Sequence, residues 1–267
     1  MVWGTAGDIG DRGKGVIVVT REEARVREAA EMIRASRFLI AFTGAGASTE
    51  SGLPDFRSPG GLWRDQNPVL VASSWGLQRY PERFFAFYRT RLSKMRGAQP
   101  NRVHSILATW ERQGLLRGVI TQNVDGLHQK AGSRNVVELH GALGRAHCDA
   151  CGRQHPASRL EERGIPRCAC GGLVRPSVVL FGERLPTDAW DKAVYLTRRA
   201  DVFLVVGSSL TVAPANLLPR MAAKVGRLVI CNRDPTPLDP LAHVVLRGTA
   251  GDVLEEIDRL LRHFRLL

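Results

Sequence analysis

Short apolar runs alternate with amphipathic stretches along most of this 267-residue chain. The apolar runs are rich in β-branched residues and stop in small or polar ones, as in "VFLVVGSS" and "RLVICN". Strands that are buried on both faces of a sheet have this composition. The pattern predicts strands at 37–42, 118–123, 136–141, 202–209, 227–232 and 243–248.

Helical periodicity fills most of the gaps between these strands. It is clearest at 21–35, 102–113, 187–200 and 214–224. Strands that alternate with helices indicate an α/β fold, with a parallel, Rossmann-like sheet and helices on both of its faces. We expect this domain to comprise residues 21–52, 106–144 and 177–267. A smaller inserted domain would comprise 53–105, as a helical module, and 145–176, as a zinc-binding module. Residues 1–20 would be a flexible tail.

Small and polar residues follow the predicted strands at the points where they end. Examples are Gly44, Gln122, His140, Ser208 and Asn232. Ligands of open parallel sheets bind beyond the carboxyl ends of the strands. The shared position of these residues therefore predicts one ligand crevice along that edge.

The stretch "FFAFYRTRLSKM" at 84–95 has the period of an amphipathic helix. Arg91 falls in the middle of the apolar arc, beside Tyr88. Arg89 and Lys94 fall outside that arc, as does Arg83, and we expect these three to face solvent. An arginine on an apolar face can extend its head to solvent, and the stretch alone does not exclude this.

Four of the five cysteines are clustered as C-x₂-C and C-x-C, at Cys148, Cys151, Cys168 and Cys170. Four thiolates at such spacings predict a closed tetrahedral zinc site with a structural role. The short second pair leaves His147 and His155 open as substitute ligands. The fifth cysteine, Cys231, stands in an apolar run and is expected to be buried in a strand.

Charge and hydropathy narrow the function class. The formal net charge is +12, but the basic residues are spread along the chain, so nucleic acid is not the expected primary partner. No apolar run is long enough to span a membrane. The first twenty residues lack the pattern of a secretion signal. We therefore expect a cytoplasmic protein. A reducing compartment fits cysteines that bind metal instead of forming disulfides. We also expect the protein to be a monomer.

The segment "TGAGAS" after the first strand is similar to a phosphate-binding turn, although Thr49 stands where a third glycine would be. The segment continues as "TESGLPDFRSPGGLW". With "TQNVDGLHQKAG", "ELHG", "RPSVVLFGE", "VGSSLTV" and "CNRD", the chain resembles the sirtuin family of NAD-dependent protein deacylases from about residue 30 to its end.

The resemblance implies NAD as co-substrate, one structural zinc ion and acyl-lysine proteins or peptides as partners. His140 and Asn123 would be the catalytic residues, with His140 as general base on a ribose hydroxyl. The cofactor-binding residues would be Gly44, Ala45, Gly46, Ser48, Asp55, Phe56, Arg57, Trp63, Gln122, Asn123, Val124, Asp125, Gly207, Ser208, Ser209, Asn232, Arg233, Asp234 and Ala250. Val179, Phe181 and Gly182 would line the groove for the substrate peptide.

Tyr88 and Arg91 form a Tyr-x-x-Arg pair, which within the sirtuins marks enzymes that remove succinyl and malonyl groups. The resemblance therefore implies a desuccinylase and demalonylase that also removes acetyl groups. The products would be free lysine, nicotinamide and O-acyl-ADP-ribose. An NAD-dependent protein ADP-ribosyltransferase is the alternative. A Rossmann oxidoreductase and a zinc-ribbon nucleic-acid binder are disfavoured by the ordered NAD motifs.

Overall fold

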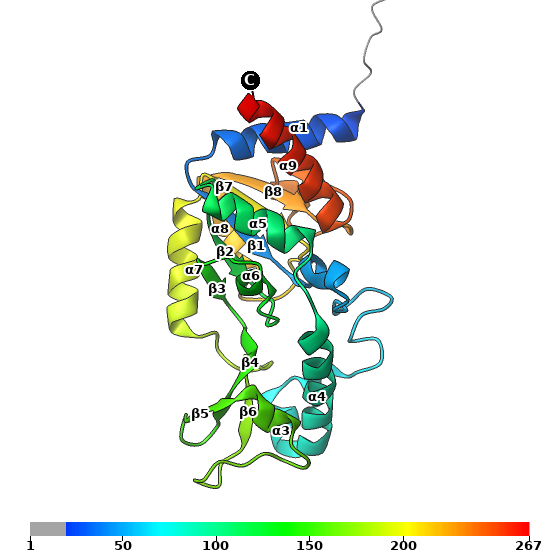
Figure 1. Ribbon diagram of the computed structural model, residues 1–267, viewed down its shortest axis with the longest axis vertical. Helices are drawn as coiled ribbons and strands as arrows, with labels where there is room; N and C mark the ends of the chain where they lie inside the picture. Colours follow the sequence, from blue (N-terminus) through cyan, green and yellow to red (C-terminus); the bar gives the residue numbers. More distant parts are fainter. Residues whose placement is uncertain (1–19, 267) are drawn as a thin grey trace, which may run out of the picture.

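Six parallel strands form the larger of two sheets in a computed structural model that describes residues 20–266 (Figure 1). The strand order is β3-β2-β1-β7-β8-β9. The strands are β1 (Leu39–Thr43), β2 (Leu116–Thr121), β3 (Val136–Glu138), β7 (Val202–Val206), β8 (Arg227–Cys231) and β9 (Val244–Leu246). All six predicted strands are present. The predicted tail covers 1–20, of which residues 1–19 lie outside the described part of the chain.

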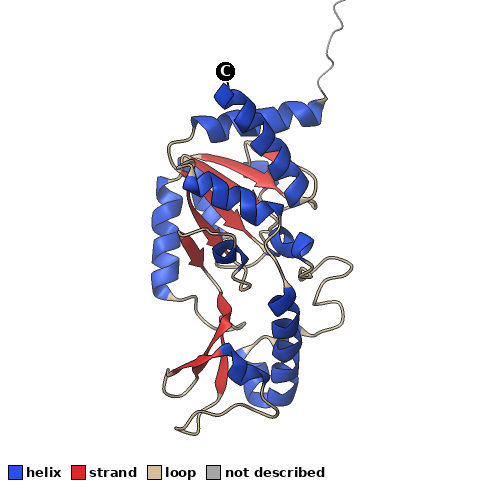
Figure 2. Cartoon of the chain, in the orientation of Figure 1, coloured by secondary structure: helices blue, strands red, loops and turns tan. Residues whose placement is uncertain are grey.

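Helices cover both faces of this sheet (Figure 2). One face packs on α1 (Arg21–Ala35), α5 (Arg102–Arg112) and α9 (Ala250–Leu266). The other face packs on α7 (Thr187–Arg199) and α8 (Leu217–Val225). Successive β1 residues serve opposite faces, as strand geometry requires, with Ala41 in the first core and Phe42 in the second. This confirms the predicted Rossmann-like α/β fold. The helix predicted at 214–224 begins at Leu217.

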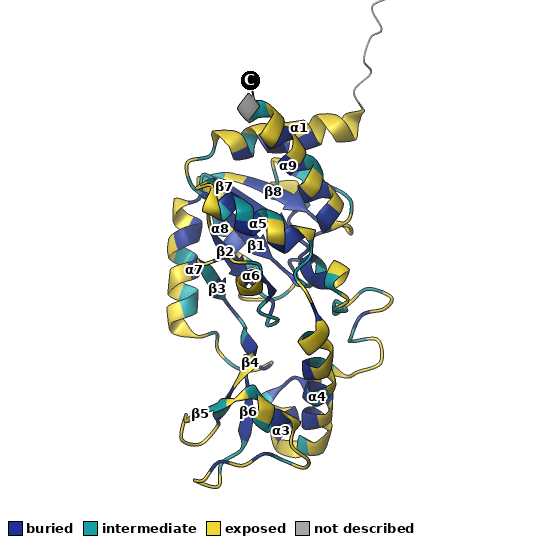
Figure 3. Ribbon diagram, viewed as in Figure 1, coloured by how far each residue is buried: buried dark blue, intermediate teal, exposed yellow. Residues whose placement is uncertain are grey.

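A smaller domain projects from the strand-end edge of the large sheet. It contains α2 (Pro68–Val71), α3 (Ser74–Arg79) and α4 (Pro81–Gly97), together with an antiparallel sheet of order β5-β4-β6. These strands are β4 (Gly141–Cys148), β5 (Gln154–Pro156) and β6 (Val174–Val178). Residues of α4 and β4 share one hydrophobic core, and Figure 3 shows the buried face of α4 turned inward.

The remaining described elements are short. They are η1 (Ala45–Ser51), α6 (Leu127–Lys130), η2 (Ala157–Glu161) and η3 (Asp239–Leu241). No helix in the described part of the chain combines the length and the apolar character needed to cross a membrane.

The packing suggests domain boundaries that differ slightly from those expected from the sequence. Val103, at the start of α5, lies in the core of the large sheet, whereas Leu143 lies in the core of the small domain. Gly141 already pairs with Val178 in the small sheet. We therefore propose that the small domain comprises about 53–101 and 141–178.

Candidate active site

A cavity of about 500 Å³ opens at the carboxyl edge of the large sheet and is lined by residues of both domains. Every residue that the sequence analysis assigned to catalysis, cofactor or substrate lines this one cavity. From the large domain these are Gly44, Ala45, Gly46, Ser48, Gln122, Asn123, Val124, Asp125, His140, Val179, Gly207, Ser208, Ser209, Asn232, Arg233, Asp234 and Ala250. From the connecting loops and the small domain they are Asp55, Phe56, Arg57, Trp63, Tyr88, Arg91, Phe181 and Gly182.

Close backbone packing explains the glycines after β1 and β7. The Gly46 amide donates to the Gly207 carbonyl oxygen at 2.8 Å. A Cβ on Gly46 would lie 2.8 Å from the Gly207 Cα, and a Cβ on Gly44 would lie 2.7 Å from the Gly207 oxygen. Gly207 also has a φ of +62°. The two turns can approach this closely only where their residues are glycines. The glycines of "TGAGAS", which we interpreted as room for the cofactor, are therefore also required by the packing of one turn against the other.

Side-chain hydrogen bonds join the strand ends into one floor. Asn123 Nδ2 donates to the Gly44 carbonyl at 3.0 Å and to Ser48 Oγ at 3.1 Å. Ser48 Oγ donates to Asp125 Oδ2 at 2.7 Å. Gln122 Nε2 donates to Ser208 Oγ at 2.7 Å. These polar side chains therefore hold the turn after β1 in place as well as lining the cavity.

Two buried histidines lie beneath this floor, and the sequence analysis did not identify them. The ring centroids of His104 and His128 are 4.8 Å apart. His104 Nε2 lies 3.4 Å from Ser48 Oγ, and His128 Nε2 lies 2.9 Å from Thr43 Oγ1. Burial lowers the pKa of both rings, that of His128 to about 3. Both histidines fall within helical stretches, where nothing in the sequence distinguishes them from ordinary helix residues.

His140 is the second residue after β3 and lines the cavity. Its Nδ1 lies 3.0 Å from the carbonyl oxygen of Gln122. Burial lowers the pKa of His140, and the hydrogen bond to that carbonyl partly opposes the shift. A neutral imidazole is therefore held at the cavity wall, which is the state that a general base requires.

Arg91 lies between aromatic rings on the small-domain side of the cavity. Its guanidinium carbon is 5.3 Å from the ring centre of Phe56 and 5.7 Å from that of Phe87. Within residues 20–266 no carboxylate lies within 4 Å of it. Tyr88 is buried beside it, and burial raises the pKa of its hydroxyl to about 12. The hydroxyl therefore stays protonated and can donate a hydrogen bond.

The other basic residues of α4 differ in their surroundings. Arg83 is exposed, as expected, and its guanidinium lies over the ring of Tyr80. Arg89 points away from the cavity and donates to the Gly164 carbonyl, so it is only partly exposed. Lys94 is exposed, but it also lines the cavity. Lys94 lies three residues after Arg91, so the two cations are neighbours on the helix surface. The apolar arc did not predict this, because Lys94 falls outside it.

Glu183 also lines the cavity, and the sequence analysis assigned it no role. Its carboxylate accepts from the Leu180 amide at 2.8 Å and pairs with Arg175 at 2.8 Å. Arg175 is buried in β6 and also lies 2.9 Å from Asp149, next to the cysteine cluster. The pair thus fixes the turn that carries Phe181 and neutralises the charge of Glu183. Arg91, in contrast, keeps its charge unpaired.

Loops after β8 and β9 form the far wall of the cavity. Asn232 Nδ2 donates to the Asp234 carbonyl at 2.7 Å, and this bond closes the loop after β8. Gly248 and Thr249 line the cavity together with Ala250, at the start of α9. Only Ala250 of these three was predicted, although Gly248 ends the strand predicted at 243–248 and the polar Thr249 follows it.

Four thiols gather at one end of the small sheet. The sulfur atoms of Cys148, Cys151, Cys168 and Cys170 all lie within 4.8 Å of one another, with Cys148 and Cys170 3.5 Å apart. Zinc–sulfur bonds of about 2.3 Å in a tetrahedron place sulfur atoms about 3.8 Å apart, so the cluster fits one zinc ion. His147 and His155 are not part of the cluster, and His147 contacts Ser177 Oγ. Cys231 is fully buried in β8, as predicted.

Comparison with known proteins agrees with this arrangement. The model of the Sir2 family matches residues 44–214, a range that holds the first cavity loop, His140 and all four clustered cysteines. The chain belongs to the Sir2 family. Residues 215–267, outside the matched range, supply the wall formed after β8 and β9.

Individual members of the Sir2 family resemble the chain over most of its length. It is 50% identical over 236 residues to "NAD-dependent protein deacetylase 1" of Geobacillus kaustophilus, a match that covers 86% of this chain and 96% of that protein. It is 47% identical over 239 residues to "NAD-dependent protein deacylase 2" of Pyrobaculum aerophilum, covering 87% and 96%. A solved structure described as "Sir2-p53 peptide-NAD+" is 38% identical and has a TM-score of 0.80. The match covers 90% of this chain and 98% of that one.

Proposed function

We propose that this Sir2-family enzyme is an NAD-dependent protein-lysine deacylase that prefers acyl groups ending in a carboxylate, such as succinyl and malonyl, and also removes acetyl groups. The names of its relatives support NAD-dependent deacetylation and deacylation. The preference for charged acyl groups rests on this chain's own residues. Products would be the free lysine, nicotinamide and an O-acyl-ADP-ribose.

The observation that carries the acyl preference is the unpaired Arg91 in the cavity wall. Aromatic rings of Phe56 and Phe87 flank its guanidinium, and no acidic partner neutralises it within the described residues. A guanidinium in such a site can bind a terminal carboxylate through two parallel hydrogen bonds. The protonated Tyr88 hydroxyl would add a third donor. The alternative, in which Arg91 simply extends to solvent, leaves these aromatic contacts without a purpose.

His140 would act as the general base. NAD supplies an activated ribose carbon when nicotinamide leaves, and the acyl oxygen attacks that carbon. The unprotonated Nε2 of His140 would then accept a proton from a ribose hydroxyl, which lets that hydroxyl attack the bound acyl carbon. One water molecule would then hydrolyse the resulting adduct, which frees the lysine amine and leaves the acyl group on the ribose. Asn123 would support the reaction by fixing the ribose, since its amide already organises the adjoining turn.

The two ends of the cavity would divide the cofactor between them. The turn after β1, with Arg57 beside it, would hold the diphosphate, because Arg57 offers a planar fork of donors. The loops after β7 and β8, with Ala250, would hold the adenosine. Phe181 and Gly182 would bind the substrate backbone as an added strand. Phe181 is half-exposed, but its amide and carbonyl already bond Ala72 and Ser74, so its side chain would contact the substrate and Gly182 would offer the backbone groups.

The cysteine cluster would bind one structural zinc ion. Its four ligands leave no open position, so the metal would stabilise the small domain and take no part in the reaction. Reduced thiols of this kind also favour a cytoplasmic location over an oxidising compartment.

The test is mass spectrometry of the products formed from NAD and matched acetyl-, malonyl- and succinyl-lysine peptides. We expect O-acyl-ADP-ribose and free lysine from each peptide, with the larger kcat/KM on the two charged ones. ADP-ribose attached to protein, without an O-acyl product, would instead identify an ADP-ribosyltransferase. Equal or better turnover of the acetyl peptide would refute the proposed acyl preference and leave the deacylase assignment standing.

A further inference from the structure

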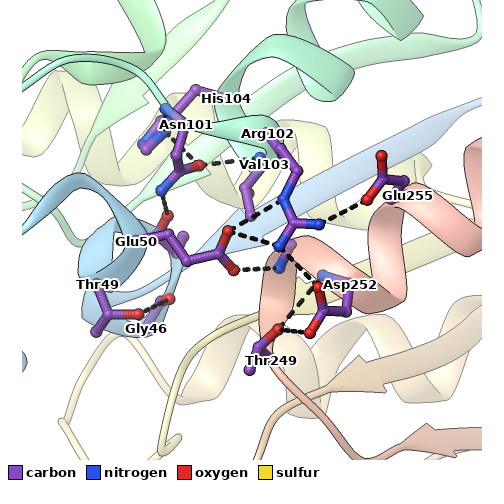
Figure 4. A network of polar contacts seen from close by, with 12 residues as sticks. Gly46, Thr49, Glu50, Asn101, Arg102, Val103, His104, Thr249, Asp252 and Glu255 are labelled. Carbon is purple, nitrogen blue, oxygen red and sulfur yellow. Dashed lines mark hydrogen bonds and ion pairs between the residues drawn. The ribbon is translucent and has the colours of Figure 1, made fainter.

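Two walls of the cavity come from distant parts of the chain and are joined behind it by a charged network (Figure 4). One wall is the turn and 3-10 helix η1, which reaches the cavity through Thr49. The other is the start of α9, which reaches it through Ala250. The residues next in sequence, Glu50 and Gly251, turn away from the cavity and contact each other. Arg102, at the start of α5, completes the network.

Glu50 binds the N-terminal end of α9 directly. Its Oε1 accepts a hydrogen bond from the Gly251 amide at 2.9 Å. That amide lies in the first turn of the helix, where it has no partner within the helix and where a negative charge is favoured. A Cβ on residue 251 would lie 2.3 Å from the Glu50 carboxylate oxygens. The approach therefore requires glycine at this position.

Arg102 binds three carboxylates at once. Its guanidinium lies 3.1 Å from Glu50, 2.7 Å from Asp252 and 2.6 Å from Glu255. Without Arg102, three like charges from two different elements would face one another. Their repulsion would push η1 and α9 apart, because these are the elements that carry them.

The start of α5 holds η1 at a second point. Asn101 Nδ2 donates to the Ala47 carbonyl at 2.9 Å, while its Oδ1 caps α5 through the Val103 amide. Thr249 Oγ1 caps α9 by accepting from the Asp252 amide at 3.4 Å, and it donates to the Asp252 carboxylate, which in turn binds Arg102. Each cavity wall is thus tied to the same helix end, and neither Glu50 nor Arg102 lines the cavity itself.

We propose that Glu50 and Arg102 are positioning residues that set the spacing of the two walls between which NAD binds. The inference rests on the proposed function, since it assigns these walls to NAD. His140 makes no hydrogen bond with this network, and Asn123 is linked to it indirectly, through Ser48 of η1. Loss of the network should therefore weaken NAD binding more than it slows the chemical step.

The test compares Arg102→Met with wild type and with Arg259→Met. Arg259 pairs with Glu256 on the exposed side of α9, so its loss removes the same charge from the region without touching the network. In Arg102→Met we expect the KM for NAD and the Kd for ADP-ribose, measured by calorimetry, to rise about fivefold, as the loss of partly exposed ion pairs allows. We expect kcat and the KM for the acyl peptide to change by less than about threefold, and Arg259→Met to match wild type.

Two further variants separate positioning from simple stability. Arg102→Lys keeps the positive charge but loses the planar set of guanidinium donors that binds three carboxylates at once. Its Kd for ADP-ribose should therefore fall between those of wild type and Arg102→Met. Glu50→Gln keeps an acceptor for the Gly251 amide, so it should fold and bind ADP-ribose a few-fold more weakly. A lower melting temperature with an unchanged Kd for ADP-ribose in Arg102→Met, or equal effects in Arg259→Met, would overturn the proposal. Wild type that does not consume NAD would instead remove the proposed function.

Discussion

The Nδ1 atom of His140 lies 3.0 Å from the carbonyl oxygen of Gln122. A carbonyl oxygen only accepts hydrogen bonds, so the proton of the neutral ring is on Nδ1 and Nε2 carries the free lone pair. Gln122 is the first residue after β2 and His140 the second after β3, and these two strands pair side by side, so the sheet brings the carbonyl and the ring together and thereby selects the tautomer. His140 can therefore accept a proton on Nε2, the nitrogen that makes no hydrogen bond with the Gln122 carbonyl.

Replacing His140 by alanine should therefore remove deacylation while leaving the fold and the cysteine cluster intact. General bases typically contribute about 10²–10⁴ in rate, so we expect kcat to fall by that factor. The measurement is kcat on the succinyl peptide, with circular dichroism and zinc content as controls. Turnover near the wild-type value would remove His140 as the base.

The pH dependence gives a second test of the same residue. Burial lowers the pKa of His140 from its usual 6.5, so the ring stays neutral below the pH at which a free histidine becomes charged. Activity that needs the neutral ring is lost only as pH falls through this lowered pKa. The acid limb of kcat/KM should have its midpoint below 6.5 in the free enzyme. A midpoint above 6.5 would show that a different group, or a more exposed His140, controls the reaction.

Arg91→Met and Arg89→Met form a matched pair on α4. The first removes a cavity-lining cation that lies between aromatic rings, and the second removes a cation that binds the Gly164 carbonyl instead. Losing a desolvated charged partner costs roughly 2–5 kcal/mol, so Arg91→Met should lose most desuccinylation and keep or raise deacetylation. Arg89→Met should retain the wild-type ratio of the two kcat/KM values. If Arg91→Met lowers both activities equally, Arg91 does not read the acyl group.

The sequence predicted the six strands and the cavity residues at their ends because both follow from one local pattern, whereas the other cavity residues were assigned through the resemblance to the sirtuins. Buried strands are continuous apolar runs, and the residues after them must meet at one edge of a parallel sheet. Gly44, Gln122 and His140 could therefore be assigned to one crevice from the sequence alone. The cysteine cluster was equally accessible, since metal-ligand spacing is a local property.

Long-range partners could not be predicted in this way. Glu50 and Gly251 lie 201 residues apart, and neither carries a local signal for the other. Lys94 was expected only to face solvent because helical periodicity describes one apolar arc, whereas the cavity wall extends past that arc. Phe56 was predicted to bind the cofactor, yet its contact with Arg91 depends on how the loop that carries it meets α4.

The cysteine cluster should hold about one zinc ion per chain. Cys168→Ser should lower both the zinc content and the melting temperature, because Cys168 and Cys148 are also buried in the small-domain core. His147→Ala is the control, since His147 lies outside the cluster and should leave the zinc content unchanged. Metal analysis that finds no zinc in active protein would contradict the prediction.

The buried His128 should make the folded protein less stable in acid. Its pKa is lowered to about 3 by burial, with a smaller contribution from His104, whereas in the unfolded chain it returns to 6.5. Above about pH 6.5 the ring is neutral in both states and has no effect on the pH dependence. Between about 3 and 6.5 only the unfolded chain binds the proton, so the free energy of unfolding falls as the pH falls.

Each pH unit in this window should cost about 1.4 kcal/mol from His128 alone. His128→Gln provides the comparison, because its amide can still donate to Thr43 Oγ1 but does not titrate. Urea unfolding at about pH 7, 6 and 5 should give a smaller acid loss in the variant, by that slope, while the carboxylates contribute equally to both proteins. Parallel losses in the two proteins would mean that His128 is protonated in the folded state, and that the neutral histidine pair beneath Ser48 does not persist in acid.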